Sequence, residues 1–286
     1  MKLMDFTTLP QKKKSYGGAN GNKISVIISD EFYMLKLPSH APKNPNLSYA
    51  NSCVSEYLGS HIFNMIGVEA QETILGIFDY NGRQRISVAC KDFEKNGYIL
   101  KDFASVKNQI IDSNSNGYGT ELQDILETIQ KQQLIDQVTL SNHFWNMFVI
   151  DALIGNWDRH NGNWGFLYRQ ETDDVKLAPI FDCGSCLFPQ IDEDTIVKCL
   201  NDKEEMNVRV FDFPTSAILL NGKRINYYKF IKSHEYDDCD KAINRIKYKI
   251  DFHKINDLID ELDCISSNHK LFLKLLLKRR YEEIFM

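Results

Sequence analysis

The sequence has no long hydrophobic run. Its most apolar late stretch, residues 271–277, is short and is interrupted by Lys274, whereas a membrane-spanning helix needs about 20 consecutive apolar residues. Residues 1–14 are too polar for a secretory signal peptide. We therefore expect a soluble, cytoplasmic protein without membrane insertion, and the sequence leaves open its export as an effector.

The sequence also has no excess of positive charge. It contains 34 Lys and Arg against 39 Asp and Glu, a formal net charge of −5, and proteins that bind phosphate backbones are usually basic. We therefore expect no nucleic-acid partner. The seven cysteines are scattered along a long chain, which favours reduced thiols over a disulfide framework. Cys183 and Cys186 have Cys-x-x-Cys spacing, but no second pair completes a metal site.

No repeat or low-complexity linker divides the 286 residues, of which 43% are hydrophobic, enough for a large core. The first part of the chain has short apolar runs bounded by Gly, Pro, Asn and Asp, which are typical of strands. One stretch has apolar residues at helical spacing and ends at Gly67. The expected elements are strands over residues 23–28, 32–37, 73–78 and 84–89 and a helix over residues 48–66.

Beyond residue 94 the pattern becomes helical. Apolar residues recur at helical spacing over residues 120–154, and helical patterns dominate residues 238–285. We predict an α+β fold with two lobes. The N-terminal lobe, residues 1–92, would be small and rich in strands, and the C-terminal lobe, residues 93–286, would be larger and mainly helical. A cleft that holds a ligand is expected between them.

A polar loop between apolar flanks carries the most informative residues. Residues 154–168 include Asp158 and Asn163, after a helix predicted to be buried and before a predicted strand. Both ends of the loop should therefore be rigid, as in loops that carry function.

A predicted hairpin after this loop is expected to bring a second carboxylate, that of Asp182, close to the loop. The segments on either side of a turn at residues 170–174 are expected to pair. Pairing residues whose numbers sum to about 345 places Tyr168 opposite Leu177 and Asn163 opposite Asp182. A carboxylate beside an amide oxygen suits Mg²⁺, which completes its coordination with water and phosphate oxygens.

The remaining parts of a phosphoryl-transfer site occur in the expected order along the chain. Asp158 is free to orient or deprotonate an attacking hydroxyl. Lys36 projects from an apolar strand, and Glu56 lies on the following helix, where it could pair with the Lys36 ammonium. Three glycines that could let backbone N–H groups close on phosphates precede this strand: Gly17, Gly18 and Gly21. Protein kinases use these parts in this order.

The polar loop and the segment after the hairpin form a recognisable pair of motifs. Their residues are Asp158, Arg159, His160, Asn161, Gly162 and Asn163, and then Leu177, Ala178, Pro179, Ile180, Phe181 and Asp182. The pair resembles the Asp-x-His-x-x-Asn and Leu-Ala-Pro-x-x-Asp signature of the HipA-like kinases, which are bacterial serine/threonine kinases with a fold related to phosphatidylinositol kinases. The resemblance extends over residues 15–189.

The resemblance implies ATP and Mg²⁺ as cofactors and assigns roles to the residues. Asp158 would be the catalytic base, Asn163 and Asp182 the magnesium ligands, and Lys36, supported by Glu56, the group that holds the ATP phosphates. The phosphate loop would consist of Gly17, Gly18, Ala19, Asn20, Gly21 and Asn22. The hinge that meets adenine through backbone groups would be residues 88–93, with Lys91 and Phe93.

The chain departs from the longer members of that family. HipA toxins carry a further N-terminal subdomain, so the chain is more similar to the compact, CtkA-type members, and this argues against an antitoxin partner. Family members autophosphorylate a serine at the glycine loop, and Ser15 stands at the matching place. Phosphate on Ser15 would add about −1.5 to −2 charge beside the ATP phosphates and close the site by repulsion.

The acceptor is expected to be Ser or Thr of a protein substrate, an expectation that comes from the resemblance. A small-molecule or lipid kinase is an alternative, because the same catalytic parts serve either acceptor. A nucleotide-binding pseudokinase that acts as an interaction module is a second alternative.

Simpler structural roles exist for each candidate. Asp158, Asn163 and Asp182 could cap turns, Lys36 could lie along a sheet edge with its ammonium in solvent, and Glu56 could be solvated.

Other conspicuous residues are expected to be structural. Arg159 should be exposed, and His160 should hold the loop in shape. The three tryptophans are expected in the core: Trp145, Trp157 and Trp164.

Overall fold

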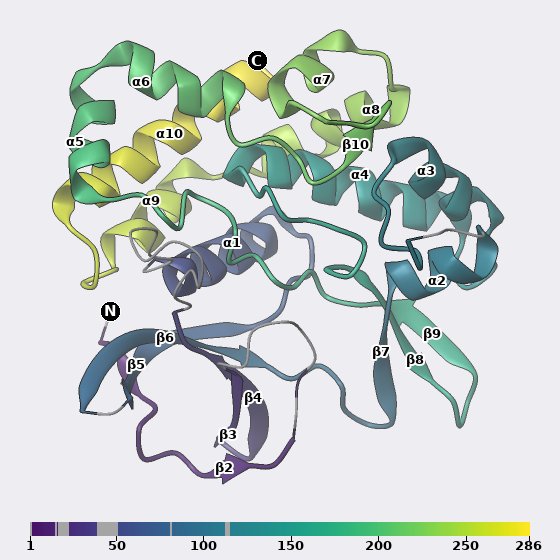
Figure 1. The fold of residues 1–286 in the computed structure, drawn as a ribbon, viewed down its shortest axis with the longest axis horizontal. Helices are drawn as coiled ribbons and strands as arrows, with labels where there is room; N and C mark the ends of the chain where they lie inside the picture. The colour runs from purple at the N-terminus through teal and green to yellow at the C-terminus, as the bar shows by residue number, and fades with distance from the viewer. Residues whose placement is uncertain (1, 15, 17–22, 39–50, 81, 112–114) are drawn as a thin grey trace.

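The computed structural model of the chain describes residues 2–14, 16, 23–38, 51–80, 82–111 and 115–286. A six-stranded sheet forms most of the first part of the chain, and helices form most of the remainder (Figure 1). This is the predicted α+β architecture. The candidate phosphate loop, residues 17–22, and Ser15 lie outside the described residues.

The large sheet has the strand order β1-β5-β6-β4-β3-β2. Its strands are β1 (Met4–Asp5), β2 (Gln11–Lys12), β3 (Lys23–Ile28), β4 (Glu31–Lys36), β5 (Thr73–Tyr80) and β6 (Arg83–Lys91). Neighbouring strands are antiparallel except β1 and β5. The four predicted strands correspond to β3, β4, β5 and β6. Ser29 and Asp30 turn the β3–β4 hairpin with φ of 48° and 64°, which short polar side chains tolerate.

Helix α1 (Ser52–Ile66) connects the sheet to the helical part. It ends at Gly67, as predicted, because Gly67 adopts a left-handed φ of 84°. Buried residues occupy most of α1, and they join the large core that continues through the C-terminal helices. The smaller core stays within the sheet: Phe6, Val26, Ile28, Tyr33, Leu35, Leu37, Phe78 and Ala89. The division of the chain into residues 1–92 and 93–286 stays a prediction.

A second sheet, β7-β8-β9, holds the predicted hairpin. Its antiparallel strands are β7 (Tyr98–Asp102), β8 (Gly165–Arg169) and β9 (Asp174–Leu177). Tyr168 lies opposite Val175, and Phe166 lies opposite Leu177, so the predicted register was wrong by two residues. The reason is the length of the turn, because Asp174 pairs with Arg169 inside the ladder. A shift of two keeps every side chain on its predicted face.

The helices of the C-terminal part surround α4, whose second half is almost wholly buried. They are α2 (Phe103–Ile110), α3 (Leu122–Lys131), α4 (Gln137–Ile154), α5 (Glu193–Asn201), α6 (Lys203–Asn207), the π-helical turn η1 (Val208–Asp212), α7 (Tyr227–Ser233), α8 (Asp237–Ile246), the 3₁₀ turn η2 (Lys247–Lys249), α9 (Phe252–Asp260) and α10 (Ser267–Phe285). A small hairpin consists of β10 (Leu219–Leu220) and β11 (Lys223–Arg224).

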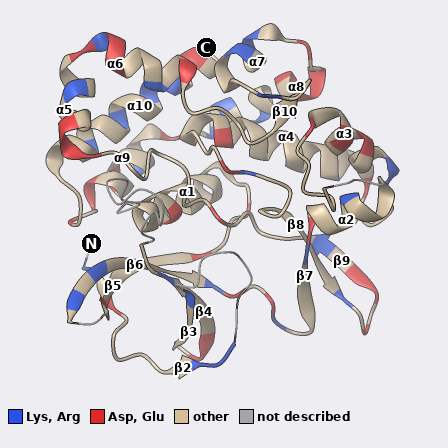
Figure 2. Cartoon of the chain, viewed as in Figure 1, with Lys and Arg blue, Asp and Glu red and all other residues tan. Residues whose placement is uncertain are grey.

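The surface helices carry charges of both signs. Figure 2 shows Lys and Arg beside Asp and Glu on α5 and α6. Among the described residues, none of the helices has the length and apolar character required to span a bilayer.

Candidate active site

Lys36 lies at the centre of three segments that are far apart in the sequence. From the end of β4, its Nζ is 2.8 Å from Oε2 of Glu56 on α1 and 2.9 Å from Oδ1 of Asp182 in the loop after β9. Glu56 is only 1% exposed, and its other oxygen accepts a hydrogen bond from the Cys183 N–H at 3.1 Å. The expected pairing of Lys36 with Glu56 is therefore present, and Asp182 joins it.

The electrostatics of this cluster keep Lys36 and Asp182 charged. Burial acts to lower the pKa of Lys36, but attraction by Asp182 and Glu56 outweighs it and raises that pKa well above its usual value. The Lys36 ammonium in turn lowers the pKa of Asp182. A half-buried lysine held in the ammonium form is suited to binding an anionic phosphate.

Arg159 is the main brace of the catalytic loop, and the expectation that it is exposed was wrong. Its side chain is almost fully buried, and its Nε is 2.9 Å from Oδ2 of Asp151 on α4. Nη1 donates to the main-chain oxygens of Asn163, at 2.8 Å, and of Phe181. Nη2 contacts Sγ of Cys183 at 3.4 Å. The arginine is buried because a buried carboxylate and two main-chain oxygens require its donors.

These bonds bring together the two residues expected to share a metal ion. One guanidinium nitrogen, Nη1 of Arg159, reaches the carbonyls of both Asn163 and Phe181. Those carbonyls are therefore no farther apart than two hydrogen-bond lengths. Asp182 directly follows Phe181, so the loop after the hairpin and the loop after α4 meet at this guanidinium.

The polar loop is also closed by hydrogen bonds of its own. Nδ2 of Asn163 donates to the main-chain oxygen of Asp158 at 3.0 Å, and the N–H of His160 donates to the same oxygen at 2.8 Å. The N–H of Asp158 donates to Oδ1 of Asn156 at 3.2 Å, and Nδ1 of His160 accepts from the Gly162 N–H at 3.1 Å. His160 thus shapes the loop, as expected.

Asp158 has a different environment from Asp182. Burial raises the pKa of the Asp158 carboxyl, and the negative charge of Asp182 adds to this, while His160 and Arg224 oppose it. Within the described ranges, its carboxylate has no hydrogen-bond donor. Two nearby carboxylates with pKa values shifted in opposite directions suit different roles, one as a proton acceptor and one as a permanent anion.

The donors available for a metal ion are one carboxylate and one amide. No three His, Cys, Asp or Glu residues in the described part of the chain form a group that could hold a metal ion. Asn163 uses Nδ2 to bind Asp158, so its Oδ1 is the atom left for a cation. Asp182 is half-buried and has a left-handed φ of 58°, a conformation that Asp tolerates better than most residues and that recurs at functional sites. This donor set fits Mg²⁺, which accepts few protein ligands.

The candidate hinge has few free backbone groups. The N–H of Lys91 donates to the oxygen of Glu72 at 2.8 Å, and the Lys91 oxygen accepts from Gln71 at 2.8 Å. The N–H of Asp92 donates to the oxygen of Phe32 at 2.8 Å. Among the described residues, the N–H of Phe93 has no acceptor, and its ring packs 5.6 Å from that of Phe181. Phe93 is therefore better placed than Lys91 to meet a ligand through its backbone.

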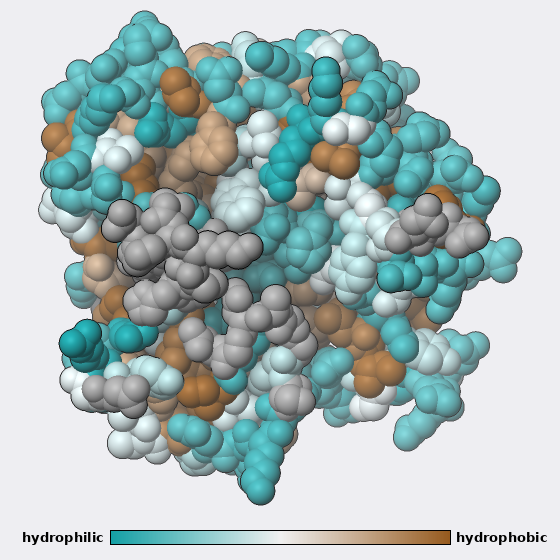
Figure 3. All heavy atoms as spheres, in the orientation of Figure 1, coloured by the Kyte–Doolittle hydropathy of each residue, from teal (hydrophilic) through white to brown (hydrophobic). Residues whose placement is uncertain are grey.

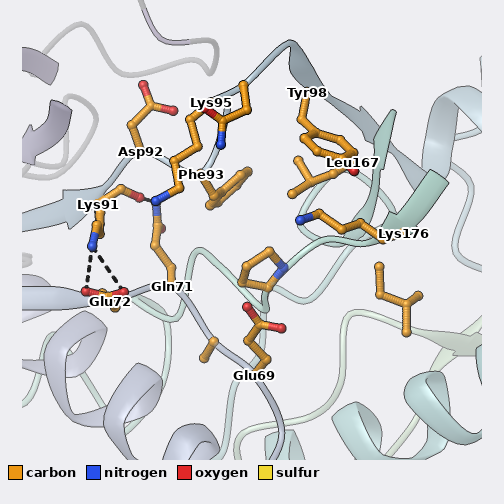
Figure 4. A pocket seen from close by; sticks show the side chains of 14 residues that line it. Glu69, Gln71, Glu72, Lys91, Asp92, Phe93, Lys95, Tyr98, Leu167 and Lys176 are labelled. Carbon is orange, nitrogen blue, oxygen red and sulfur yellow. Dashed lines mark hydrogen bonds and ion pairs between the residues drawn. The ribbon is translucent and has the colours of Figure 1, made fainter. Parts of the chain in front are cut away.

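A small pocket of about 210 Å³ lies beside the hinge (Figure 4). Residues 69–72, the hinge and the β8–β9 hairpin line it, and the Lys91 ammonium binds Glu72 there at 3.1 Å. Lys36, Asp158 and Asn163 do not line this pocket. The side chain of Lys91 is thus engaged away from the Lys36 cluster.

The sequence interpretation missed the buried polar residues that hold the loop carrying Asp158. Asp151 and Asn156 are buried and hold the loop from the α4 side, and Asn161 donates to the oxygens of Gly117 and Gly119 at 2.9 and 2.8 Å. The available signal was Asp151 itself, an acidic residue within the apolar end of a helix, because such a residue requires a buried partner.

Comparison with known proteins identifies the relatives of this chain. A model of the family described as HipA-like C-terminal domain matches residues 14–262. The serine/threonine-protein kinase CtkA of Helicobacter pylori is 44% identical over 99% of this chain and 87% of that protein. The crystal structure of the proinflammatory kinase CtkA from Helicobacter pylori matches with a TM-score of 0.93, covering 99% of this chain and 95% of that chain.

A more distant structure has the same fold. The toxin–antitoxin complex of HipA, HipB and operator DNA from Shewanella oneidensis matches with a TM-score of 0.52 and 10% identity, over 96% of this chain and 65% of that chain. At this identity the likeness concerns the fold alone.

Proposed function

Because this chain belongs to the HipA-like C-terminal domain family, we propose that it is a serine/threonine-protein kinase that transfers the γ-phosphoryl group of ATP to a protein hydroxyl. The observation that carries the proposal is the contact of Lys36 with Glu56 and Asp182 beside the loop that presents Asp158. This contact supports a site that combines a cation for phosphates, an anion for a metal and a candidate base.

Each residue of the site has a distinct task in the proposed reaction. Asp158 positions the acceptor hydroxyl and takes its proton, and its raised pKa supports that use. Lys36 binds the phosphates of ATP, and Glu56 holds the Lys36 ammonium in place. Asn163 and Asp182 would hold Mg²⁺, which supplies positive charge against the β- and γ-phosphates.

The rest of the ATP site follows from the sequence and from the hinge. Residues 17–22 are the proposed phosphate loop, and the Phe93 N–H is the proposed contact to adenine. Ser15 is the proposed site of autophosphorylation. Mass spectrometry of the freshly purified protein tests the last point, and an unmodified Ser15 together with unchanged activity in Ser15→Ala would refute it.

The test of the proposed function is transfer of label from γ-³²P-ATP in the presence of magnesium. We expect incorporation into proteins of a cell lysate, with phosphoserine or phosphothreonine recovered after hydrolysis, and no incorporation with the Lys36→Met variant. The matched control is Lys101→Met, which removes an exposed strand lysine.

Two results would contradict the proposal. Label confined to lipid or metabolite fractions would indicate a small-molecule or lipid kinase. Thermal stabilisation by ATP without transfer to any acceptor would indicate a pseudokinase.

A further inference from the structure

A second cavity, larger than the pocket beside the hinge, opens beside Trp157, the residue that precedes Asp158. It has a volume of about 560 Å³ and is mainly apolar. Six of the residues that line it are Trp157, Phe188, Asp192, Arg209, Phe213 and Arg224. We refer to these six residues as the acceptor groove.

The groove adjoins the candidate active site, because Arg224, which lines it, donates to the Trp157 oxygen at 3.1 Å and its charge acts on the Asp158 carboxyl. Trp157 directly precedes Asp158, and Phe188 follows Asp182 after a short loop. The N–H of Leu187 donates to the oxygen of Ile154 at 2.9 Å, which fixes that loop to the end of α4. A chain lying in the groove would therefore lie beside the loop that carries Asp158.

The apolar wall of the groove is rigid. Phe213 is 53% exposed, and its ring centre lies 5.9 Å from that of Phe188. Arg280 of α10 lies under Phe188 at 5.4 Å and donates to the oxygens of Arg209, at 2.7 Å, and of Phe213, at 3.4 Å. Leu187 and Phe188 both have positive φ, 54° and 58°, which places strained backbone in this wall. An exposed aromatic ring on a braced support is suited to receiving an apolar side chain.

The charged residues of the groove leave one positive group for a ligand. Arg209 binds Glu205 at 2.6 Å, and Asp192 accepts the Thr195 N–H at 2.8 Å. Arg224 is exposed and donates to the oxygen of Trp157 at 3.1 Å. No carboxylate of the described residues forms an ion pair with Arg224.

The hairpin that carries Arg224 is held in place. The carboxylate of Glu121 accepts the N–H groups of Asn221, at 2.6 Å, and Gly222, at 3.1 Å, at its turn. Figure 3 shows an apolar tan area next to strongly hydrophilic atoms between the positions of α6 and β10. Arg224 thus extends from a hairpin whose turn is held, and it lines the same cavity as Phe188 and Phe213.

We propose that the acceptor groove binds the substrate protein as an extended segment, in which the acceptor Ser or Thr is flanked by a large apolar residue and by an acidic residue. The apolar side chain packs against Phe213 and Phe188, and the acidic side chain pairs with Arg224, as charge complementarity requires. This inference rests on the proposed kinase function and adds the class of substrate sequence.

The test uses synthetic peptides with a single central Ser, whose flanking positions are acidic, neutral or basic and apolar or small. Wild-type protein should phosphorylate the apolar–acidic peptides with the highest kcat/KM. Arg224→Glu should lower kcat/KM for them by about five- to tenfold and should make basic peptides the better substrates. Phe213→Ser should weaken the preference for the apolar residue, and Phe213→Leu should retain it.

The matched control is Lys223→Glu, which reverses a neighbouring exposed charge that does not line the groove. It should leave the order of peptide preference unchanged. An unchanged preference in Arg224→Glu overturns the inference, as does phosphorylation of proteins but of none of the peptides. Failure to transfer phosphate to any acceptor, proteins included, instead overturns the proposed function.

Discussion

Arg159 and Asp151 form a buried ion pair, with Nε and Oδ2 2.9 Å apart and both side chains 1% exposed. The same guanidinium holds the carbonyls of Asn163 and Phe181. The pair therefore stabilises the α4 end of the catalytic loop and also sets the distance between the two segments that carry the proposed metal ligands.

Breaking this pair should cost both stability and activity. Arg159→Met leaves Asp151 buried without a partner, and we expect the free energy of unfolding to fall by about 3–5 kcal/mol. Phosphoryl transfer should fall at least about tenfold, since misplaced catalytic groups lose rate steeply. Urea unfolding and initial rates of transfer measure the two effects.

The double variant Asp151→Leu, Arg159→Met separates the two roles. Removing both charges should restore much of the lost stability, because no unpaired charge remains in the core. Activity should stay low, because the carbonyls of Asn163 and Phe181 are still without their common donor. A double variant that regains wild-type activity would show that Arg159 does not position the metal ligands.

Gly59 on α1 provides a test of how closely this helix packs on the loop after Asp182. A Cβ at Gly59 would lie 2.7 Å from Cβ of Cys183 and 3.0 Å from Sγ of Cys186. Alanine normally stabilises a helix interior by about 1 kcal/mol relative to glycine. Here we expect Gly59→Ala to destabilise the protein by about 1–3 kcal/mol, because the site has no room.

Ser60→Ala is the matched control for this change. The Ser60 Oγ is buried and has no hydrogen-bond partner among the described residues, so its removal should not lower the free energy of unfolding. An increase in stability in Gly59→Ala, measured by urea unfolding, would mean that the loop yields and that the contact is not tight.

The convergence of Lys36, Asp158, Asn163 and Asp182 could be anticipated from sequence, because residue types, motif spacing and chain order all indicated one site. The interactions that hold this site in place could not be anticipated from the sequence. Arg159 is polar and lies in a loop, and only the tertiary position of Asp151 makes it a core residue.

For the fold as well, some features could be predicted from the sequence and others could not. Strands β3 to β6 and the stop of α1 at Gly67 follow local signals, namely β-branched runs and glycine at a left-handed position. Strand β7 was missed because it is short and exposes alternate residues. The predicted register of the β8–β9 hairpin was wrong by two residues. The sequence does not show whether Asp174 belongs to the turn or pairs within the strands.

Magnesium should be required for stabilisation of the protein by ATP. With ATP and magnesium at about 100 times the dissociation constant, the stability of the wild-type protein should rise by about 2.7 kcal/mol, and EDTA should remove most of that gain. Asp182→Asn should lose the magnesium-dependent part, because an amide replaces the only carboxylate proposed as a ligand. Thermal unfolding with and without EDTA measures this.

Asp173→Asn is the control for this experiment, because it changes an exposed carboxylate in the β8–β9 turn. It should retain the full magnesium-dependent shift. If Asp182→Asn also retained it, the proposed metal site would be wrong.

The most direct measurement compares the rate of γ-phosphoryl transfer with the thermal shift caused by magnesium and ATP in Asp158→Asn. The account predicts that transfer falls by about 10²–10⁴-fold, the range expected for the loss of a general base, while the thermal shift stays as in the wild type. Transfer at the wild-type rate in this variant would contradict the central claim that Asp158 is the catalytic base.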